Sequence, residues 1–348
     1  MPYDHPAPSP LAAVVARLMA DGKGLLAIDE SLPTADKRFK AENIPQTEEM
    51  RRQWRELILT TPSLGEAISG AILYDETIRQ KTRDGTAFTE IMGRAGIIIG
   101  IKVDKGTVDL PGHEGETMTE GLDGLRERLK DYREMGAEFA KWRGVITIGP
   151  DRPSRACLEA NAQALALYAA LCQAEGLVPV VEPEVLMDGD HSLERCGEVT
   201  AKVLDVVFAH LKTQRVRLEE MLLKPNMVLP GDDHAQTVTP EQVADATLAC
   251  FRRSIPAAVG GIAFLSGGQS GPEATARLNA MHADKDPLPW PLTFSFGRAL
   301  QEPALHIWHG NAANTEAAQK ALLHRARLDS AARRGLYDPA MEQDTVLL

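Results

Sequence analysis

A short apolar run that ends in a lysine, MLLKPNM at residues 221–227, gives the first indication of the fold. Three apolar residues followed by Lys224 and Pro225 are typical of a buried strand of a parallel sheet that ends at the lysine. A lysine held there loses water, which penalises the ammonium and favours the neutral amine, a nucleophile for carbonyl carbon. The alternative is that Lys224 reaches from the strand end into solvent.

Seven further apolar runs resemble this one, at residues 25–28, 68–74, 95–103, 138–144, 178–185, 259–265 and 292–296. Helical patterns alternate with them, at residues 11–20, 35–42, 47–60, 75–81, 120–134, 154–175, 191–213, 240–251, 272–282, 298–308 and 314–334. Eight strands that alternate with helices predict an α/β fold, a TIM or (β/α)8 barrel with extra N- and C-terminal helices. An open doubly wound sheet is the alternative, but no G-x-G-x-x-G pattern follows the first strand.

The chain is expected to form one domain. A length of 348 residues suits a single barrel, and no repeat or linker divides the sequence. The segments at about residues 1–10 and 336–348 are predicted to be loose, and residues 104–119 to form a long loop.

Composition restricts the partners and the compartment. A net charge of −11 and a pI near 5.4 disfavour general binding of nucleic acid or of anionic membranes. No apolar run approaches the roughly 20 residues of a membrane span, and the first residues lack the pattern of an export signal. The four cysteines lie far apart without a C-x-x-C pair, which disfavours structural zinc and suits a reducing compartment. The cytoplasm is the expected location.

Charged residues stand at the predicted strand ends, where the active site of a barrel forms. They are Asp29, Lys102, Lys141, Arg143, Glu182, Glu184 and Lys224. Alternation along a strand places Lys141 and Arg143 on the same face of their strand, and Glu182 and Glu184 on the same face of theirs. Each pair can therefore point into the mouth of the barrel. Charges in apolar strands need partners, so an inert ion network is one interpretation. An active site explains more, because a second lysine beside Lys224 disfavours another positive charge and a carboxylate can move protons.

Two groups of residues are candidates for anion sites. Ser266, Gly267 and the residues up to Gly271 precede a predicted helix, where glycine lets backbone N–H groups approach a phosphate. Gly297 and Arg298 follow the eighth strand and can reach the same place. A second basic group consists of Ser31, Lys37, Arg38 and Lys102. These groups predict a ligand with a phosphate at each end and Lys224 between them.

Seven motifs, in order, closely resemble those of class I fructose-1,6-bisphosphate aldolase. They are GKGLLAIDES (22–31), GIKVDKG (100–106), FAKWR (139–143), VEPE (181–184), LLKPNM (222–227), LSGGQS (265–270) and SFGR (295–298). The likeness runs from about residue 5 to about residue 335. It implies reversible cleavage of fructose 1,6-bisphosphate to dihydroxyacetone phosphate and glyceraldehyde 3-phosphate, in glycolysis or gluconeogenesis.

The resemblance also implies residue roles. Lys224 forms a Schiff base with the C2 carbonyl, Glu182 is the general acid and base with support from Glu184, and Asp29 takes the proton of the C4 hydroxyl. Lys141 positions and tunes this centre, assisted by Arg143. The residues that would bind the C1 phosphate are Ser266, Gly267, Gly297 and Arg298. Those that would bind the C6 phosphate are Ser31, Lys102, Lys37 and Arg38. The resemblance implies no metal or cofactor. It does imply a homo-oligomer, and the expected form is a homotetramer.

Two positions depart from the family pattern. Thr34 replaces a common serine, which preserves the hydroxyl. The chain ends DTVLL, without the terminal tyrosine of many animal members, so a proton transfer assisted by the tail is not expected from the sequence.

Three other functions stay open at this stage. A zinc-dependent aldolase needs a histidine cluster, whereas the nine histidines are scattered and the closest pair, His306 and His309, has no evident third ligand. Another Schiff-base lyase, such as a transaldolase, fits less well with two phosphate groups. A non-catalytic scaffold would not require the complete set of proposed groups.

Overall fold

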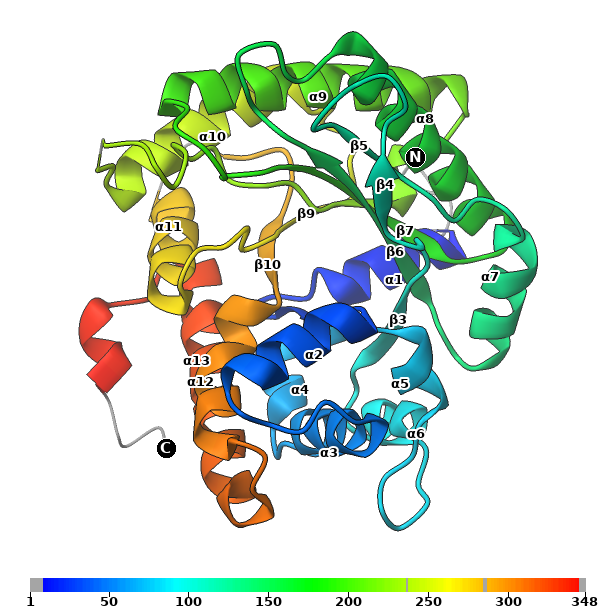
Figure 1. Cartoon of the computed structure of the whole chain (residues 1–348), viewed down its shortest axis with the longest axis vertical. Coiled ribbons are helices and arrows are strands. Elements are labelled where there is room, and N and C mark those ends of the chain that lie inside the picture. The colour runs from blue at the N-terminus through cyan, green and yellow to red at the C-terminus, as the bar shows by residue number, and fades with distance from the viewer. Residues whose placement is uncertain (1–8, 236, 284–286, 344–348) are drawn as a thin grey trace, which may run out of the picture.

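The computed structural model describes residues 9–235, 237–283 and 287–343, and its centre is a closed barrel of parallel strands (Figure 1). The strand order is β1-β10-β9-β8-β7-β6-β3-β2. The strands are β1 (Gly24–Ile28), β2 (Ile68–Leu73), β3 (Ile98–Lys102), β6 (Phe139–Ile146), β7 (Val178–Val185), β8 (Leu222–Leu223), β9 (Ile262–Phe264) and β10 (Leu292–Phe296). The predicted (β/α)8 barrel is therefore confirmed.

Helices surround the barrel, with α8, α9 and α10 on one side and α3, α12 and α13 on the other (Figure 1). The α-helices are α1 (Pro10–Leu18), α2 (Leu32–Ala41), α3 (Glu48–Leu59), α4 (Leu64–Ala67), α5 (Asp75–Arg79), α6 (Phe88–Arg94), α7 (Leu125–Glu134), α8 (Arg155–Ala174), α9 (Leu193–Thr213), α10 (Pro240–Ser254), α11 (Gly271–Ala283), α12 (Arg298–Trp308) and α13 (Thr315–Arg333). Three 3₁₀ segments are η1 (Leu218–Glu220), η2 (Ala312–Asn314) and η3 (Pro339–Gln343).

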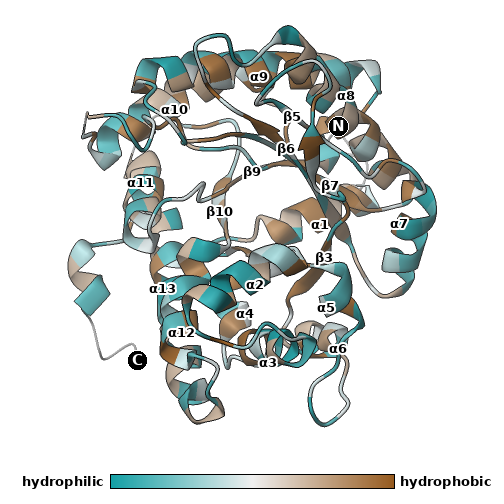
Figure 2. Ribbon diagram, in the orientation of Figure 1, coloured by the Kyte–Doolittle hydropathy of each residue, from teal (hydrophilic) through white to brown (hydrophobic). Residues whose placement is uncertain are grey.

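Two apolar cores result from the alternation of side chains along the strands. Leu25 and Ala27 point into the barrel, whereas Leu26 and Ile28 pack in the core outside it. The inner core also contains Leu18 of α1, so this helix closes the end of the barrel at which the strands begin. Figure 2 shows apolar colour on the central strands and polar colour on outer helices such as α7. Within the described residues, no helix is both long and apolar enough to span a membrane.

Several boundaries differ from the sequence prediction. The predicted loop 104–119 contains an antiparallel hairpin, β4 (Thr107–Asp109) with β5 (Thr117–Thr119). The helix predicted from residue 120 begins only at Leu125, because Gly121 and Gly124 adopt positive φ angles. Helices α4 and α6 were not predicted at all. Strand β6 continues past residue 144 to Ile146, because β7 pairs with it along its full length.

The C-terminal part of the chain is more ordered than predicted. Residues 339–343 form η3, and Glu342 accepts two hydrogen bonds from Arg325 Nη1, at 2.7 and 2.8 Å. The Tyr337 hydroxyl also donates to Glu342, at 2.8 Å. The segment predicted to be loose thus contains a short 3₁₀ helix, which Glu342 connects to Arg325 of α13. Residues 1–8 and 344–348, also predicted to be loose, lie outside the described residues.

Candidate active site

A cavity of about 1070 Å³ lies at the end of the barrel where the strands finish. Every site residue predicted from the sequence lines it: Asp29, Ser31, Lys37, Arg38, Lys102, Lys141, Arg143, Glu182, Glu184, Lys224, Ser266, Gly267, Gly297 and Arg298. The closed strand order explains this, because it brings the ends of distant segments to one mouth.

Lys224 follows the two-residue strand β8 and is held by its backbone. Its N–H donates to the Val181 carbonyl of β7, at 2.8 Å. Two residues later, the Asn226 side chain accepts from the Val185 N–H at 3.1 Å and donates to Thr200 Oγ1 at 3.1 Å. Lys224 itself is only 3% exposed. The alternative of a lysine that reaches solvent is therefore wrong.

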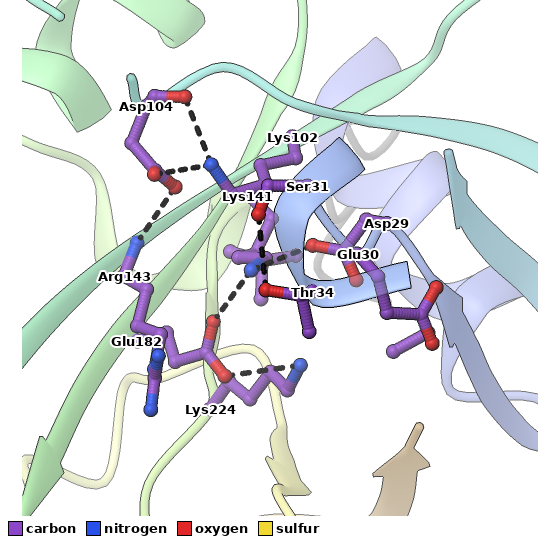
Figure 3. A network of polar contacts seen from close by, with 12 residues as sticks. Asp29, Glu30, Ser31, Thr34, Lys102, Asp104, Lys141, Arg143, Glu182 and Lys224 are labelled. Carbon is purple, nitrogen blue, oxygen red and sulfur yellow. Dashed lines mark hydrogen bonds and ion pairs between the residues drawn. The ribbon is translucent and has the colours of Figure 1, made fainter. Parts of the chain in front are cut away.

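Four buried charges form a connected network around this lysine (Figure 3). Lys224 Nζ lies 3.1 Å from Glu182 Oε1, and Lys141 Nζ lies 3.0 Å from Glu182 Oε2. Lys141 Nζ also lies 2.7 Å from Asp29 Oδ2. Glu182 is thus shared between two amines, one on the neighbouring strand β6 and one after β8.

The network fixes the resting charges of its members. Burial acts to raise the pKa of Asp29, but Lys141 and Lys224 outweigh it and lower that pKa to about 2. Burial also acts to raise the pKa of Glu182, but the same two lysines outweigh it and lower that pKa. For Lys141, burial acts to lower the pKa, but Asp29 and Glu182 raise it well above its usual value. Asp29 and Glu182 are therefore carboxylates at neutral pH, and Lys141 is an ammonium.

A second group of charges joins β3 to β6. Lys102 Nζ lies 2.5 Å from Asp104 Oδ1, and the Arg143 N–H donates to Asp104 Oδ2 at 3.3 Å. The Arg143 side chain pairs with Glu184 of β7. Asp104 was absent from the predicted site. Asp104 lies two residues beyond the end of β3 at Lys102, and a strand period of two continued past that end would place it on the same side as Lys102. This was the signal that could have found it.

The glycine-rich turn lies between β9 and α11. Gly267 has a φ of +56° and Gly268 a φ of +99°, a region that favours glycine. A Cβ on Gly267 would also approach Leu265 Cδ1 to 2.9 Å. Arg298, the first residue of α12, donates through Nη2 to the Gly268 carbonyl at 2.5 Å. The turn and the guanidinium thus lie side by side, as an anion site requires.

The second predicted anion site lies on α2 and the turn before it. Ser31 Oγ and Thr34 Oγ1 are 3.0 Å apart, and Lys37 is exposed. Arg38 lines the cavity and already pairs with Glu30, which also pairs with Arg55 at 2.8 Å. Burial acts to raise the pKa of Glu30, but these two guanidinium groups outweigh it and lower that pKa. Sequence reasoning did not assign Glu30, although it lies inside the first quoted motif.

Metal ligands do not cluster in the described part of the chain, where no three histidine, cysteine or acidic side chains are placed to hold one ion. His306 and His309 both face Glu42, with Nδ1–Oε2 distances of 3.4 and 3.5 Å, and both are exposed. All four cysteines are buried and unbonded to one another.

Comparison with known proteins agrees with the motifs. The family model described as fructose-bisphosphate aldolase class-I matches residues 10–346. The chain is 53% identical over 328 residues to a probable fructose-bisphosphate aldolase class 1 of Xanthomonas campestris, an alignment that covers 94% of this chain and 98% of that protein. It is 51% identical over 327 residues to the cytosolic fructose-bisphosphate aldolase 4 of Arabidopsis thaliana, covering 94% and 83%.

A solved structure agrees as well. The fructose-bisphosphate aldolase of Plasmodium falciparum, crystallised with TRAP and a small-molecule inhibitor, superposes with a TM-score of 0.93 at 46% identity, covering 94% of this chain and 95% of that one. Fold, motifs and relatives together show that the chain belongs to the class I fructose-bisphosphate aldolase family.

Proposed function

We propose that this protein cleaves fructose 1,6-bisphosphate reversibly to dihydroxyacetone phosphate and glyceraldehyde 3-phosphate, through a Schiff base on Lys224. The observation that carries the proposal is the buried Lys224 with its Nζ 3.1 Å from Glu182, which in turn lies 3.0 Å from Lys141. A nucleophilic amine next to a proton carrier is what Schiff-base chemistry needs.

Schiff-base formation begins when the neutral Lys224 amine attacks the C2 carbonyl carbon. Glu182, a carboxylate at rest, accepts a proton from the attacking nitrogen and returns it to the C2 oxygen, which gives a carbinolamine. Glu182 then delivers a second proton, taken up from solvent, to the C2 hydroxyl, which leaves as water. The product is an iminium, with its positive charge beside the Glu182 carboxylate. Lys141 holds Glu182 in place from its other oxygen, 3.0 Å away.

Carbon–carbon cleavage then uses the iminium as an electron sink. Asp29 takes the proton of the C4 hydroxyl, the C3–C4 bond breaks, and its electrons pass to the iminium to form an enamine. The aldehyde is released as glyceraldehyde 3-phosphate. The low pKa of Asp29, about 2, keeps it ionised until this step. Protonation of the enamine at C3 and hydrolysis of the iminium release dihydroxyacetone phosphate and restore Lys224.

The two phosphates are assigned to opposite edges of the cavity. Ser266, Gly267, Gly297 and Arg298 are proposed to bind the C1 phosphate. Ser31, Lys37, Arg38 and Lys102 are proposed to bind the C6 phosphate, with Arg143 and Glu184 beside the centre. The pairing of Arg38 with Glu30 and of Lys102 with Asp104 means that these two cations meet a phosphate only alongside their carboxylates.

Borohydride reduction in the presence of dihydroxyacetone phosphate tests the mechanism. We expect irreversible loss of activity and a mass increase on the peptide that contains Lys224, because reduction of the iminium gives a stable secondary amine. Inactivation without modification of Lys224 would contradict the assignment. Loss of activity on chelator treatment alone would favour a metal-dependent mechanism instead.

The location and the assembly are further parts of the proposal. We infer a cytoplasmic enzyme of glycolysis or gluconeogenesis, supported by four buried free thiols and by relatives named as cytosolic. A homotetramer follows from the family resemblance. Light scattering after size-exclusion chromatography measures the subunit number, and a monomer would contradict it.

A further inference from the structure

Asp104 is a buried acid of the cavity to which the proposed reaction assigns no step. It follows β3 by two residues and is 8% exposed. Burial of a carboxylate is costly unless hydrogen bonds and charges compensate it. Its partners therefore indicate what it does.

Those partners come from three places in the chain. Asp104 Oδ1 accepts from Lys102 Nζ at 2.5 Å and from the Gly106 N–H at 3.1 Å. The backbone carbonyl of Asp104 accepts a second hydrogen bond from Lys102 Nζ, at 3.0 Å. Asp104 Oδ2 accepts from the backbone N–H of Arg143 at 3.3 Å. One residue thus joins the end of β3 to β6 and occupies two of the three N–H donors of Lys102.

This arrangement orders Lys102 before any ligand arrives. A free lysine side chain loses rotamer entropy when a ligand fixes it. In this site the Lys102 side chain is only 12% exposed, and both contacts to Asp104 hold it at the mouth of the cavity. One donor stays available for a ligand. Lys37, on the facing helix α2, is by contrast exposed.

We propose that Asp104 is a positioning residue that presets Lys102 for the phosphate at the aldehyde end of the substrate, and that it thereby favours sugar bisphosphates over ketose 1-phosphates. The inference rests on the proposed function and deepens it. Asp104 lies at the edge of the charged network away from Lys224 (Figure 3). Its side-chain partner is Lys102, although its charge also helps to raise the pKa of Lys141. Its main effect is therefore expected on binding of the C6 phosphate.

The test compares two substrates in the variant Asp104→Asn, which keeps the shape and removes the charge. We expect the KM for fructose 1,6-bisphosphate to rise about tenfold, the size of one charge-assisted hydrogen bond. We expect its kcat, and the KM for fructose 1-phosphate, to stay within about twofold, because neither depends on Lys102. Asp104→Glu keeps the charge and should recover part of the KM.

A double-mutant cycle separates positioning from a general structural role. If Asp104 acts through Lys102, the variant Lys102→Met with Asp104→Asn has the same KM for the bisphosphate as Lys102→Met alone. Effects that multiply overturn the proposal. Two other results for Asp104→Asn also overturn the proposal: an equal rise of KM for both substrates, and an unchanged KM for the bisphosphate. A lower KM for the bisphosphate overturns it as well, because Asp104 would then compete with the phosphate for Lys102.

Two controls complete the design. Asp109→Asn makes the same substitution five residues on, at an exposed position of β4, and should leave both KM values unchanged. Trapping with dihydroxyacetone phosphate and borohydride is measured on the wild type and on each variant, alongside thermal unfolding. If the wild type does not trap, the proposed function fails. If the wild type traps and cleaves while Asp104→Asn behaves like it, only the role of Asp104 fails.

Discussion

The two ends of the barrel bury cations in different ways. At the mouth, the amines of Lys141 and Lys224 face the carboxylates of Asp29 and Glu182 at 2.7 to 3.1 Å. At the opposite end, the guanidinium of Arg333 in α13 donates to four backbone carbonyls. They belong to Met19, Ala20, Lys23 and Leu292.

The difference shows in the electrostatics. Burial lowers the pKa of Arg333 to about 10, with only a partial offset from Asp21. At the mouth, the nearby carboxylates raise the pKa of Lys141 instead. Carboxylates can exchange protons with an amine, whereas carbonyls can only accept hydrogen bonds. The mouth is thus equipped for proton transfer, and the other end for holding α1, β1, β10 and α13 together.

Lys224→Met should abolish turnover and leave the fold intact. The methionine fills the same space without an amine, so no Schiff base forms, and kcat should fall by on the order of 10⁴-fold or more. Steady-state cleavage assays and circular dichroism measure the two properties. Substantial residual cleavage by a pure, folded variant would remove Lys224 from the mechanism.

Glu182→Gln should lower kcat by about 10²- to 10⁴-fold, the usual range for loss of a general acid and base. The matched control is Glu138→Gln, just before β6 at the opposite end, where Glu138 pairs with Arg17 at 2.6 Å. It should retain full activity. Equal losses in the two variants would break the contrast between the ends of the barrel.

Arg298→Ala should chiefly raise the KM for phosphorylated substrates, by about tenfold to a hundredfold, since one charge-assisted contact to a phosphate is lost. Arg94→Ala, which removes an exposed guanidinium paired with Glu90, serves as the control. An unchanged KM in Arg298→Ala would contradict the C1 phosphate assignment.

Arg333→Met should leave KM and kcat at their wild-type values and lower the free energy of unfolding by about 2–5 kcal/mol. The reason is that buried carbonyls lose their donors. Denaturant unfolding and steady-state kinetics, measured together, test both parts. A marked change in KM would mean that the two ends are coupled.

The buried Asp329 of α13 should make the stability of the protein depend on pH. Burial raises the pKa of Asp329 to about 7, against the opposing effects of Arg325 and Thr275. The folded chain then binds a proton that the unfolded chain, with an aspartate pKa near 3.8, has already lost. This contribution to stability is present at low pH and is lost as the pH rises from about 4 to 7. The difference in unfolding free energy between wild type and Asp329→Asn should therefore change with pH across that window, and a constant difference would contradict it.

Much of the fold could be predicted because it rests on local patterns. Apolar runs such as 178–185 and helices such as 154–175 appear in the structure within a few residues of the predicted bounds. The short hairpin β4–β5 and the four-residue helix α4 could not, because elements of three or four residues carry too little periodicity. The order at η3 depends on Glu342 meeting Arg325, a contact with no local signal.

Which charged side chains stand at strand ends could be predicted from the sequence, because strand period and apolar run length depend on near neighbours along the chain. The pairing of those charges, by contrast, depends on the closed barrel. Glu182 faces both Lys141 and Lys224, and the Arg143 side chain faces Glu184, because closing the barrel sets the register between strands. An ion pair depends on a distance of a few ångströms, and residues far apart in sequence acquire that distance only when the sheet closes.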